Sequence, residues 1–330
     1  MISIIFLLSL IYFVFHRDYQ EIIKCVSQIS ILEFFYILVM GIGYVLLDSA
    51  SYYIMIVFQF PNLKFKQAMK VTLLGVFANI STFHAGTVPI QSYYLYRQGI
   101  GVGTGIGTMI LECVFHKLAV FIYAMFVIVM HINWLRDTVP ELMKYIYLGI
   151  VINASIIFIL LLLCTWKKVQ NILLIIINKL PDNEKWHERK VDWTANLEAL
   201  YSESKRILKD RKCCWYVIAT NLLKLFWVFS IPFVSMHILG YTSLSFKQTQ
   251  ILSSMMFLII GVLPNVAGVG PTEVAFLMLF SPYIGYIAAS SSLVLYRVAD
   301  YFCPFIMSVF VFIKEKNNLM YDLKEKKLSK

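Results

Sequence analysis

Long apolar runs recur along the whole chain and are separated by short polar intervals. A helix needs roughly 20 apolar residues to cross about 30 Å of bilayer hydrocarbon. The runs of about that length are Ile31–Phe58, Thr104–Trp134, Tyr145–Cys164, Trp215–Gly240, Phe246–Leu263 and Tyr286–Ile313. The shorter stretch Met1–Phe15 has neither a basic leading segment nor a small-residue cleavage site, so we interpret it as a first membrane helix. The pattern predicts an all-α polytopic integral membrane protein with about 6–8 transmembrane helices.

Two of the apolar regions are interrupted, one near residues 79–91 and one near residues 264–273. Glycine and proline at these breaks release backbone groups from the helical hydrogen-bond ladder. In hydrocarbon those groups must be satisfied by protein or water, so broken backbone at membrane depth normally lines a cavity. The candidate cavity residues at the breaks are Asn79, His84, Gly86, Pro89, Gln91, Pro264, Asn265, Gly268, Gly270 and Glu273.

The two breaks share their internal spacing, which indicates a repeat. Three pairs of residues are each 182 positions apart: Gly86 and Gly268, Pro89 and Pro271, Gln91 and Glu273. Flanking lysines and arginines place both ends of the first break on the cytoplasmic side, whereas both ends of the second fall outside. We therefore expect two re-entrant hairpins in an inverted repeat, as in secondary transporters. The alternative, in which every arm spans and the chain crosses up to ten times, stays open.

Composition supports a single membrane domain. Hydrophobic residues make up 59% of the 330 and charged residues 15%, against about 25% charged residues in soluble proteins. The expected organisation is a first half at 1–164, a cytoplasmic amphipathic linker at 165–213, a second half at 214–313 and a basic tail at 314–330. The net charge of +10 is concentrated in the linker and the tail, which is typical of the cytoplasmic face. These features predict a multi-pass plasma-membrane protein, bacterial, with a cytoplasmic C-terminus.

The charged linker has two open interpretations. Its apolar residues follow helical spacing, which fits a helix lying on the cytoplasmic leaflet or a linker helix without a lipid role. Its cations either set the topology alone or also recruit anionic lipids. The apolar positions are Trp193, Leu197, Leu200, Ile207 and Leu208.

Ionisable residues within apolar segments are functional candidates, because burying them is costly unless they are paired or hydrated. Glu112 and His116 are four residues apart and share a helix face, as do Arg297 and Asp300, three apart. These groups either lock helices together as ion pairs or bind a ligand. Arg297 suits a lipid phosphate because a guanidinium binds phosphate in a bidentate way. Glu273 stands where a half-helix would begin, a position at which the helix dipole favours a carboxylate.

Other chemistry finds no support in the sequence. The glycine-rich stretch Gly101–Gly107 lacks the Lys-Ser/Thr of a phosphate loop. Gly103 and Gly107 instead allow another helix to approach closely. The six cysteines form no CxxC pair and no metal-ligand pattern, so we expect no metal and no cofactor.

At both breaks the sequence resembles the transmembrane, flippase-like region of lysylphosphatidylglycerol synthases. The resemblance covers nearly the whole chain. At the first break it lacks the family's glycine–glutamate pattern, since Thr87 follows Gly86 and Gln91 stands further on, so it does not extend to an acidic side chain there. The residues that carry it are Asn79 to Gly86 and Pro89, the run Tyr94–Ile100, Glu112, the run Leu263–Glu273, and Leu295–Arg297.

This resemblance implies a lipid translocase that moves a phospholipid such as lysylphosphatidylglycerol, or a lipid-linked sugar, between leaflets. It leads us to expect a stand-alone member without the soluble aminoacyltransferase domain. The alternative is a lysyl-tRNA-dependent phosphatidylglycerol lysyltransferase, or its membrane subunit, in resistance to cationic peptides; a third is a scaffold for envelope assembly. The expected partners are membrane lipids and a separate lipid synthase or glycosyltransferase. Nucleic acid is expected only if the lysyltransferase interpretation holds.

Overall fold

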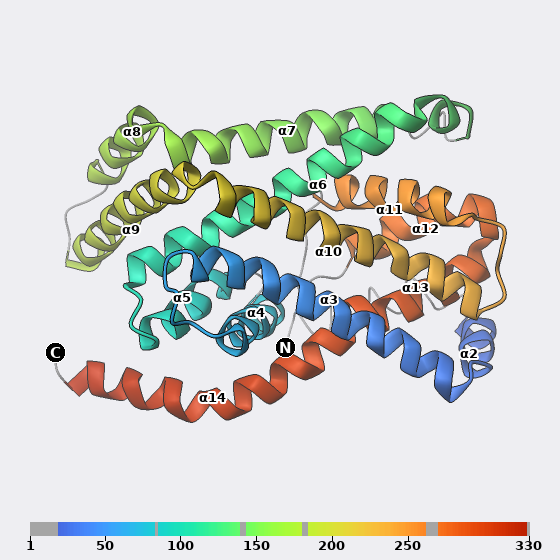
Figure 1. Ribbon diagram of the computed structural model, residues 1–330, viewed down its shortest axis with the longest axis horizontal. Coiled ribbons are helices and arrows are strands. Elements are labelled where there is room, and N and C mark those ends of the chain that lie inside the picture. Colours follow the sequence, from blue (N-terminus) through green and yellow to red (C-terminus); the bar gives the residue numbers. More distant parts are fainter. Residues whose placement is uncertain (1–18, 83–84, 139–142, 180–183, 262–269, 329–330) are drawn as a thin grey trace. The chain divides into compact units, whose positions relative to one another are not determined.

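The computed structural model describes residues 19–82, 85–138, 143–179, 184–261 and 270–328, and these residues are overwhelmingly helical (Figure 1). The helices are α2 (Tyr19–Ser27), α3 (Ile31–Val57), α4 (Phe65–Ser81), α5 (Thr87–Arg97), α6 (Val102–Thr138), α7 (Met143–Thr165), α8 (Lys167–Asn178), α9 (Glu184–Lys209), α10 (Arg211–Ile238), α11 (Phe246–Ile260), α12 (Pro271–Ile284), α13 (Tyr286–Arg297), the π-helical turn η2 (Val298–Phe302) and α14 (Cys303–Leu328).

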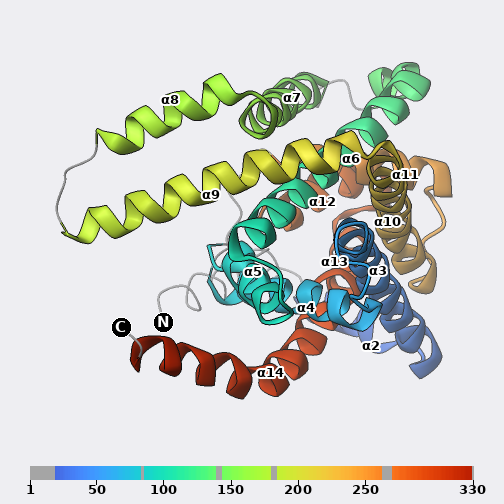
Figure 2. The ribbon, with the colours of Figure 1, turned by 60° about the vertical axis from the view of Figure 1, so that its left-hand side comes forward.

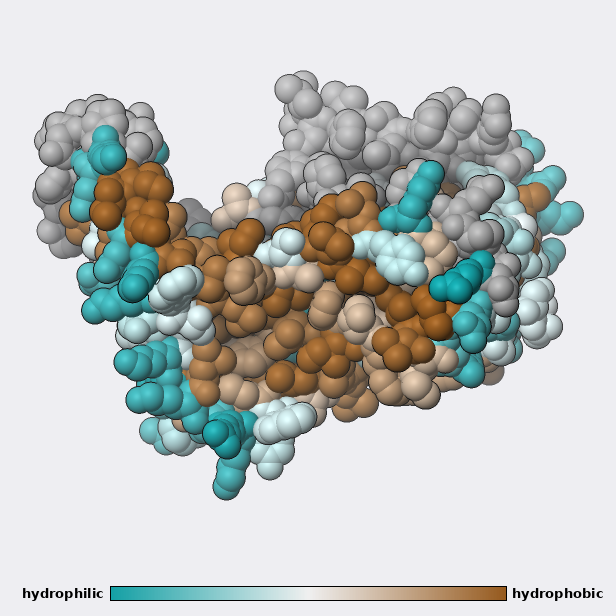
Figure 3. All heavy atoms as spheres, turned by 90° about the horizontal axis from the view of Figure 1, so that it is seen from above, coloured by the Kyte–Doolittle hydropathy of each residue, from teal (hydrophilic) through white to brown (hydrophobic). Residues whose placement is uncertain are grey.

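Five helical segments of the described chain are long and apolar enough to cross a membrane. They carry exposed aromatic side chains, among them Phe126, Phe158 and Phe310, each exposed by more than 60%. Figure 3 shows one face of the protein on which hydrophobic residues cover much of the surface. Exposed apolar surface of this extent suits lipid rather than water. The segments are Ile31–Val57, Val102–Arg136, Ile146–Thr165, Arg211–Ile238 and Tyr286–Lys316.

The prediction of an all-α polytopic membrane protein is therefore confirmed, with one shortened element. The run Phe246–Leu263 forms α11, which ends at Ile260 and has 15 residues. At about 1.5 Å per residue it is roughly 22 Å long, less than the bilayer core. The stretch Met1–Phe15 lies outside the described residues.

The described chain divides into two compact units. The first comprises Met1–Leu47, Ala119–Asn153 and Leu222–Met307, and the second comprises Asp48–Leu118, Ala154–Asn221 and Ser308–Lys330. The first unit has a large apolar core that includes Phe229, Phe276 and Phe280, to which α10 and α12 contribute. The second has two smaller clusters, around Phe115 and around Tyr94. The first break belongs to the second unit, and the described end of the second break belongs to the first.

Helix boundaries repeat along the chain with the spacing of the breaks. Adding 182 to the bounds of α3 gives 213–239, close to Arg211–Ile238 of α10. The same shift of α4 gives 247–263, where α11 begins at residue 246, and the shift of α5 gives 269–279, where α12 begins at residue 271. Shifted α6 covers 284–320, which α13, η2 and α14 occupy. These matches support the internal repeat, in which α7 to α9 form an additional segment between the halves.

The first helix of each hairpin also begins in the same way. The backbone N–H of Lys64 donates to Gln67 Oε1 over 2.8 Å at the start of α4. The backbone N–H of Ser245 donates to Gln248 Oε1 over 2.9 Å at the start of α11. Each glutamine satisfies a backbone donor that the helix leaves free at its N-terminus. Within the units, α4 packs on α5, and α12 packs on both α11 and α13 (Figures 1 and 2).

Candidate functional site

Glu273 lies in the first turn of α12, directly after the second break. Gly270 precedes the helix with a φ of 107°, a left-handed conformation that favours glycine, and Pro271 begins the helix. The Gly270 backbone N–H donates to Glu273 Oε2 over 2.6 Å. Only 5% of Glu273 is exposed, so this buried carboxylate caps the helix that follows the break.

Arg297, at the C-terminal end of α13, is the partner of this carboxylate. Its Nε donates to Glu273 Oε1 over 2.7 Å, and its Nη2 lies 2.6 Å from the same oxygen. Its Nη1 donates to Asp300 Oδ2 over 3.3 Å. The three side chains form a cluster in the first unit, here called the charge cluster, of one guanidinium and two carboxyl groups; Arg297 and Glu273 are buried, and Asp300 is partly exposed.

The backbone changes form at the charge cluster. Residues Val298–Phe302 form a π-helical turn rather than an α-helical one. Such turns are rare and are frequently found at functional sites. Arg297 ends α13 and Asp300 lies within the turn, so the altered turn sets how these two side chains meet. The ring of Tyr301, in the same turn, lies 5.5 Å from the guanidinium carbon of Arg297.

Three consecutive serines on α13 were not anticipated from the sequence. Ser290, Ser291 and Ser292 are fully buried, and their hydroxyls have no hydrogen-bond partner among the described residues. Other serines in this protein, such as Ser204 and Ser235, donate to the carbonyl four residues earlier in their own helix. An unsatisfied buried hydroxyl costs about 1–3 kcal/mol. The sequence feature that could have identified these serines is a run of three polar residues within an otherwise apolar span.

At the first break, the structure joins α4 to α5 through Gln91. Gln91 is 2% exposed, and its Nε2 donates to the carbonyl of Val71 over 3.2 Å. Its side chain lies over Gly75, where any Cβ would collide with it. Gln91 therefore fastens the two arms of the hairpin together, a role that needs an amide donor and no charge.

The other candidates at the first break lie close to it along the chain. Asn79 is on α4, and its buried Oδ1 has no partner in the part of the chain that the structure describes. Gly86 precedes α5, and its N–H donates to Thr82 Oγ1 over 2.6 Å. Pro89 is in the first turn of α5. Four further candidates lie outside the described residues: His84, Pro264, Asn265 and Gly268.

Glu112 belongs to a buried polar network in the second unit. Ser51 donates to Glu112 Oε1 over 2.9 Å, and Asn221 Nδ2 donates to Ser51 Oγ over 2.7 Å. His116 Nδ1 lies 3.3 Å from Asn221 Oδ1, so Glu112 and His116 are connected through two neutral side chains. The ionisable candidates thus fall into two groups, the charge cluster of the first unit and the Glu112 network of the second.

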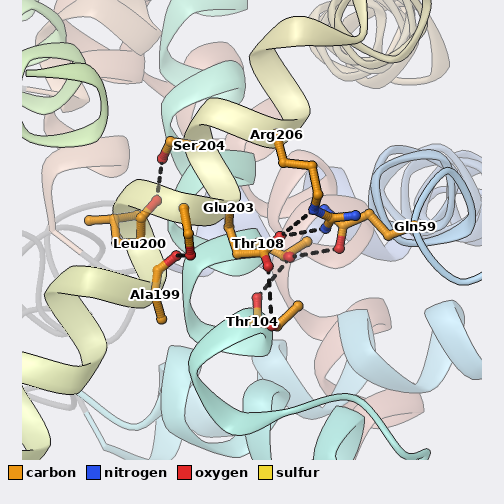
Figure 4. A network of polar contacts seen from close by, with 9 residues as sticks. Gln59, Thr104, Thr108, Ala199, Leu200, Glu203, Ser204 and Arg206 are labelled. Atoms are coloured by element: carbon orange, nitrogen blue, oxygen red, sulfur yellow. Dashed lines mark hydrogen bonds and ion pairs between the residues drawn. The ribbon is translucent and has the colours of Figure 1, made fainter.

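A second polar network, also missed from the sequence, joins α6 to α9 within the second unit (Figure 4). Thr104 donates to Glu203 Oε1 over 3.1 Å, and Arg206 pairs with Glu203 Oε2. The close approach expected at Gly103 and Gly107 is found beside it. A Cβ at Gly103 would lie 2.6 Å from the Cβ of Ala199. Within the described residues, no group of three His, Cys, Asp or Glu side chains is arranged to hold a metal ion.

Comparison with protein families decides the relationship that the two breaks suggested. Residues 1–308 match the family model described as the lysylphosphatidylglycerol synthase TM region. The chain belongs to this family. Comparison with curated proteins and with solved structures gave no match. Family membership, together with the five apolar helices, makes the chain a multi-pass membrane protein connected with lysylphosphatidylglycerol synthesis or translocation.

Proposed function

We propose that this protein is a lipid translocase that passes the headgroup of an aminoacylated phospholipid, lysylphosphatidylglycerol, from one leaflet to the other. The observation that carries the proposal is the charge cluster at the start of α12. Buried charges such as those of Glu273 and Arg297 are costly in an apolar protein unless they serve a purpose. Glu273 stands directly after a break in the helix, where a cavity is expected, and it pairs with Arg297 there.

The charges of the cluster match those of the lipid pairwise. Glu273, Asp300 and Arg297 together carry one net negative charge when all are ionised. Lysylphosphatidylglycerol carries one phosphate and two ammonium groups, and therefore one net positive charge. A phosphate at Arg297 and ammonium groups at the two carboxylates replace the internal ion pairs one for one. A lipid-linked sugar phosphate brings negative charge alone and leaves both carboxylates opposed to it.

Exchange of this kind keeps every charge paired throughout. With no lipid bound, Glu273 and Asp300 neutralise Arg297. When the headgroup enters, its phosphate replaces the carboxylates at the guanidinium. Each displaced carboxylate then pairs with one ammonium group of the headgroup. Ser290 lies two helical turns before Arg297 on the same face of α13 and adds a buried hydroxyl that has no partner within the described chain. Such a site holds a polar headgroup without leaving a buried charge alone.

Helix lengths support hairpins that enter and leave the membrane on one side. Helices α4, α5 and α12 have 17, 11 and 14 residues. At about 1.5 Å per residue they are roughly 26, 16 and 21 Å long, too short to cross about 30 Å of hydrocarbon. If the hairpins do not cross, α3 and α10 are the first and fourth of five spans and run in opposite directions. The repeat is then inverted, and the basic tail is cytoplasmic.

The test is transport by the purified chain in liposomes of phosphatidylcholine that contain fluorescent lysylphosphatidylglycerol. We expect the labelled lipid to exchange between leaflets faster than in empty vesicles and faster than labelled phosphatidylglycerol in the same vesicles. Equal rates with and without protein would refute the proposal. Equal acceleration of both lipids would refute the charge-matching argument, because phosphatidylglycerol lacks the ammonium groups.

A further inference from the structure

Helix α8 begins where the membrane span Ile146–Thr165 ends, and α9 runs back alongside it (Figure 2). Trp166 forms the junction and is half exposed. At the other end of α8, Lys190 of α9 donates from Nζ to the carbonyl of Asn178 over 3.3 Å. A cation at a helix C-terminus is stabilising. The start of α8 is therefore joined directly to the end of a membrane span. Its other end is held by Lys190.

The two faces of α8 have different surroundings. Gln170 is 4% exposed, and its Nε2 donates to the carbonyl of Leu163, which fixes that face against the protein. On another face Ile172, Ile175 and Ile176 are 57%, 55% and 54% exposed. Three exposed isoleucines at i, i+3 and i+4 form one apolar arc, since residues at these spacings share a helix face.

Lysines close both ends of this arc. Lys168 precedes Ile172 by four residues, and Lys179 follows Ile175 by four. Both lysines therefore lie on the same side of the helix as the isoleucines. Lysine side chains extend along apolar surface and place their ammonium groups at its polar boundary. An apolar arc with a lysine at each end fits a helix that lies flat at the level of lipid phosphates.

Helix α9 has a different environment, although the sequence suggests that it too is amphipathic. Its residues Leu200 and Ile207 are buried in the core of the second unit. Ala199 lies against Gly103 of α6. The C-terminal part of the apolar stripe of α9 is thus covered by protein, while Trp193 near its start is 40% exposed, and the apolar arc of α8 is exposed over its whole length.

We propose that α8 is a docking surface for an anionic lipid leaflet. Ile172, Ile175 and Ile176 enter the boundary between headgroups and acyl chains, and Lys168 and Lys179 bind lipid phosphates. The helix has 12 residues, too few to span, and it begins at the end of a span, so a bilayer surface is within its reach. The two cations complement the anionic headgroups. This inference is independent of lipid translocation.

The test measures the depth of nitroxide labels in the full chain, with its six native cysteines replaced by alanine and one cysteine placed on α8. The protein is reconstituted in vesicles of phosphatidylcholine with about one quarter phosphatidylglycerol. We expect labels at Ile172 and Ile176 to lie about 5–10 Å below the phosphates, accessible to oxygen and shielded from a water-soluble nickel chelate. Labels at Asn171 and Asn178, which are exposed on the polar edge, should collide with the nickel chelate.

The lysines are tested by charge reversal in the same vesicles. The double change Lys168→Glu and Lys179→Glu should move the label at Ile176 toward water when phosphatidylglycerol is present. It should have a smaller effect in phosphatidylcholine alone, where the leaflet is uncharged. Lys247→Glu, at the start of α11 in the other unit, makes one such charge reversal outside α8 and should leave the label in place.

Two results would overturn the proposal. If the labels at Ile172 and Ile176 are as accessible to the nickel chelate as those at Asn171 and Asn178, the arc faces water. If they are shielded from both oxygen and the nickel chelate, protein covers the arc, whether a second copy of the chain or another partner.

Discussion

Gly41 on α3 lies against the backbone of Ala299 in the π-helical turn. A Cβ at Gly41 would be 2.6 Å from the Ala299 carbonyl oxygen and 3.1 Å from Cys303 Cβ. Real Cβ atoms do not approach backbone oxygens this closely, so only glycine fits without a shift. Because Asp300 lies in the same turn and pairs with Arg297, α3 supports the charge cluster through this contact.

Replacing Gly41 by alanine should therefore destabilise the protein by about 1–3 kcal/mol, the usual range for overpacking. The obstacle is backbone rather than a flexible side chain, so it cannot turn away. Thermal unfolding in detergent measures the effect. Gly149→Ala is the matched control, because the nearest atom to its Cβ is 3.8 Å away and alanine favours the helix by about 0.5–1 kcal/mol. Equal stability of the two variants would contradict this account of the contact.

Much of this arrangement was predictable from the sequence, because it depends on local pattern. Five of the six long apolar runs correspond to the five spans, and the spacing of Arg297 and Asp300 predicted that they are neighbours. The glycines at 103 and 107 predicted a close helix contact, although not the partner helix α9.

The parts that escaped prediction depend on long-range packing. No local pattern indicates that residues 298–302 adopt a π-helical turn or that Gln91 bonds to Val71. The serines at 290–292 resemble ordinary helix serines until their environment is known. Phosphate binding by Arg297 stays a prediction, since the structure shows its carboxylate partners and contains no lipid.

The contact between Gly103 and Ala199 makes a prediction that can be tested by rescue. Gly103→Ala should destabilise the protein, because the new Cβ would lie 2.6 Å from the Cβ of Ala199. Ala199→Gly alone should cost about 1 kcal/mol through helix propensity. Combined, the two changes should be less destabilising than the sum of the single effects, since the second removes the atom with which the first collides. Strict additivity of the unfolding free energies would show that the helices do not meet here.

Lys70 and Glu315 connect the first hairpin to α14 within the second unit. Lys70 Nζ donates to Glu315 Oε1 over 2.6 Å, and Arg97 Nη1 lies 3.9 Å from Oε2. The rings of Phe77 and Phe312 stack beside them with centroids 3.9 Å apart. Glu315→Gln should lower stability by on the order of 1 kcal/mol, because the pair is partly exposed and screened. Lys66→Gln, an exposed position on the same helix, should change stability less.

The pH dependence of this pair follows from Lys70. Its hydrogen bond to Glu315 raises the pKa of Lys70 above the ordinary value of 10.5. A raised lysine pKa stabilises the fold fully below the ordinary value, and the stabilisation is lost as the pH rises through the higher one. The stability difference between wild type and Lys70→Gln should therefore be constant between about pH 6 and pH 9 and shrink only in stronger alkali. If the stability difference between wild type and Lys70→Gln already shrinks near neutral pH, the raised pKa of Lys70 is contradicted.

Substitutions in the charge cluster should separate folding from transport. Arg297→Lys keeps the charge but loses the fork that holds Glu273 and Asp300. Transport should fall about tenfold or more, the equivalent of one charge-assisted hydrogen bond, while the protein still folds. Glu273→Gln should lower the free energy of unfolding by about 3 kcal/mol, because it weakens both the pair with Arg297 and the contact with Gly270. It should therefore reduce expression more than Arg297→Lys does. Asp300→Asn should cost less, since its single contact with Arg297 is 3.3 Å long.

The double variant Glu273→Gln with Arg297→Gln decides whether the cluster only locks helices together. Removing both members of a buried ion pair is often nearly neutral for stability, whereas removing one leaves a buried charge without its partner. Arg297→Gln alone leaves two carboxylates without their cation, and the double variant leaves only Asp300, so the double variant should unfold closer to wild type than Arg297→Gln does. Its transport of lysylphosphatidylglycerol, measured per folded molecule, should nevertheless stay lost, because the phosphate no longer has a guanidinium. Wild-type transport by a stable double variant would show that the pair is structural and that the headgroup binds elsewhere.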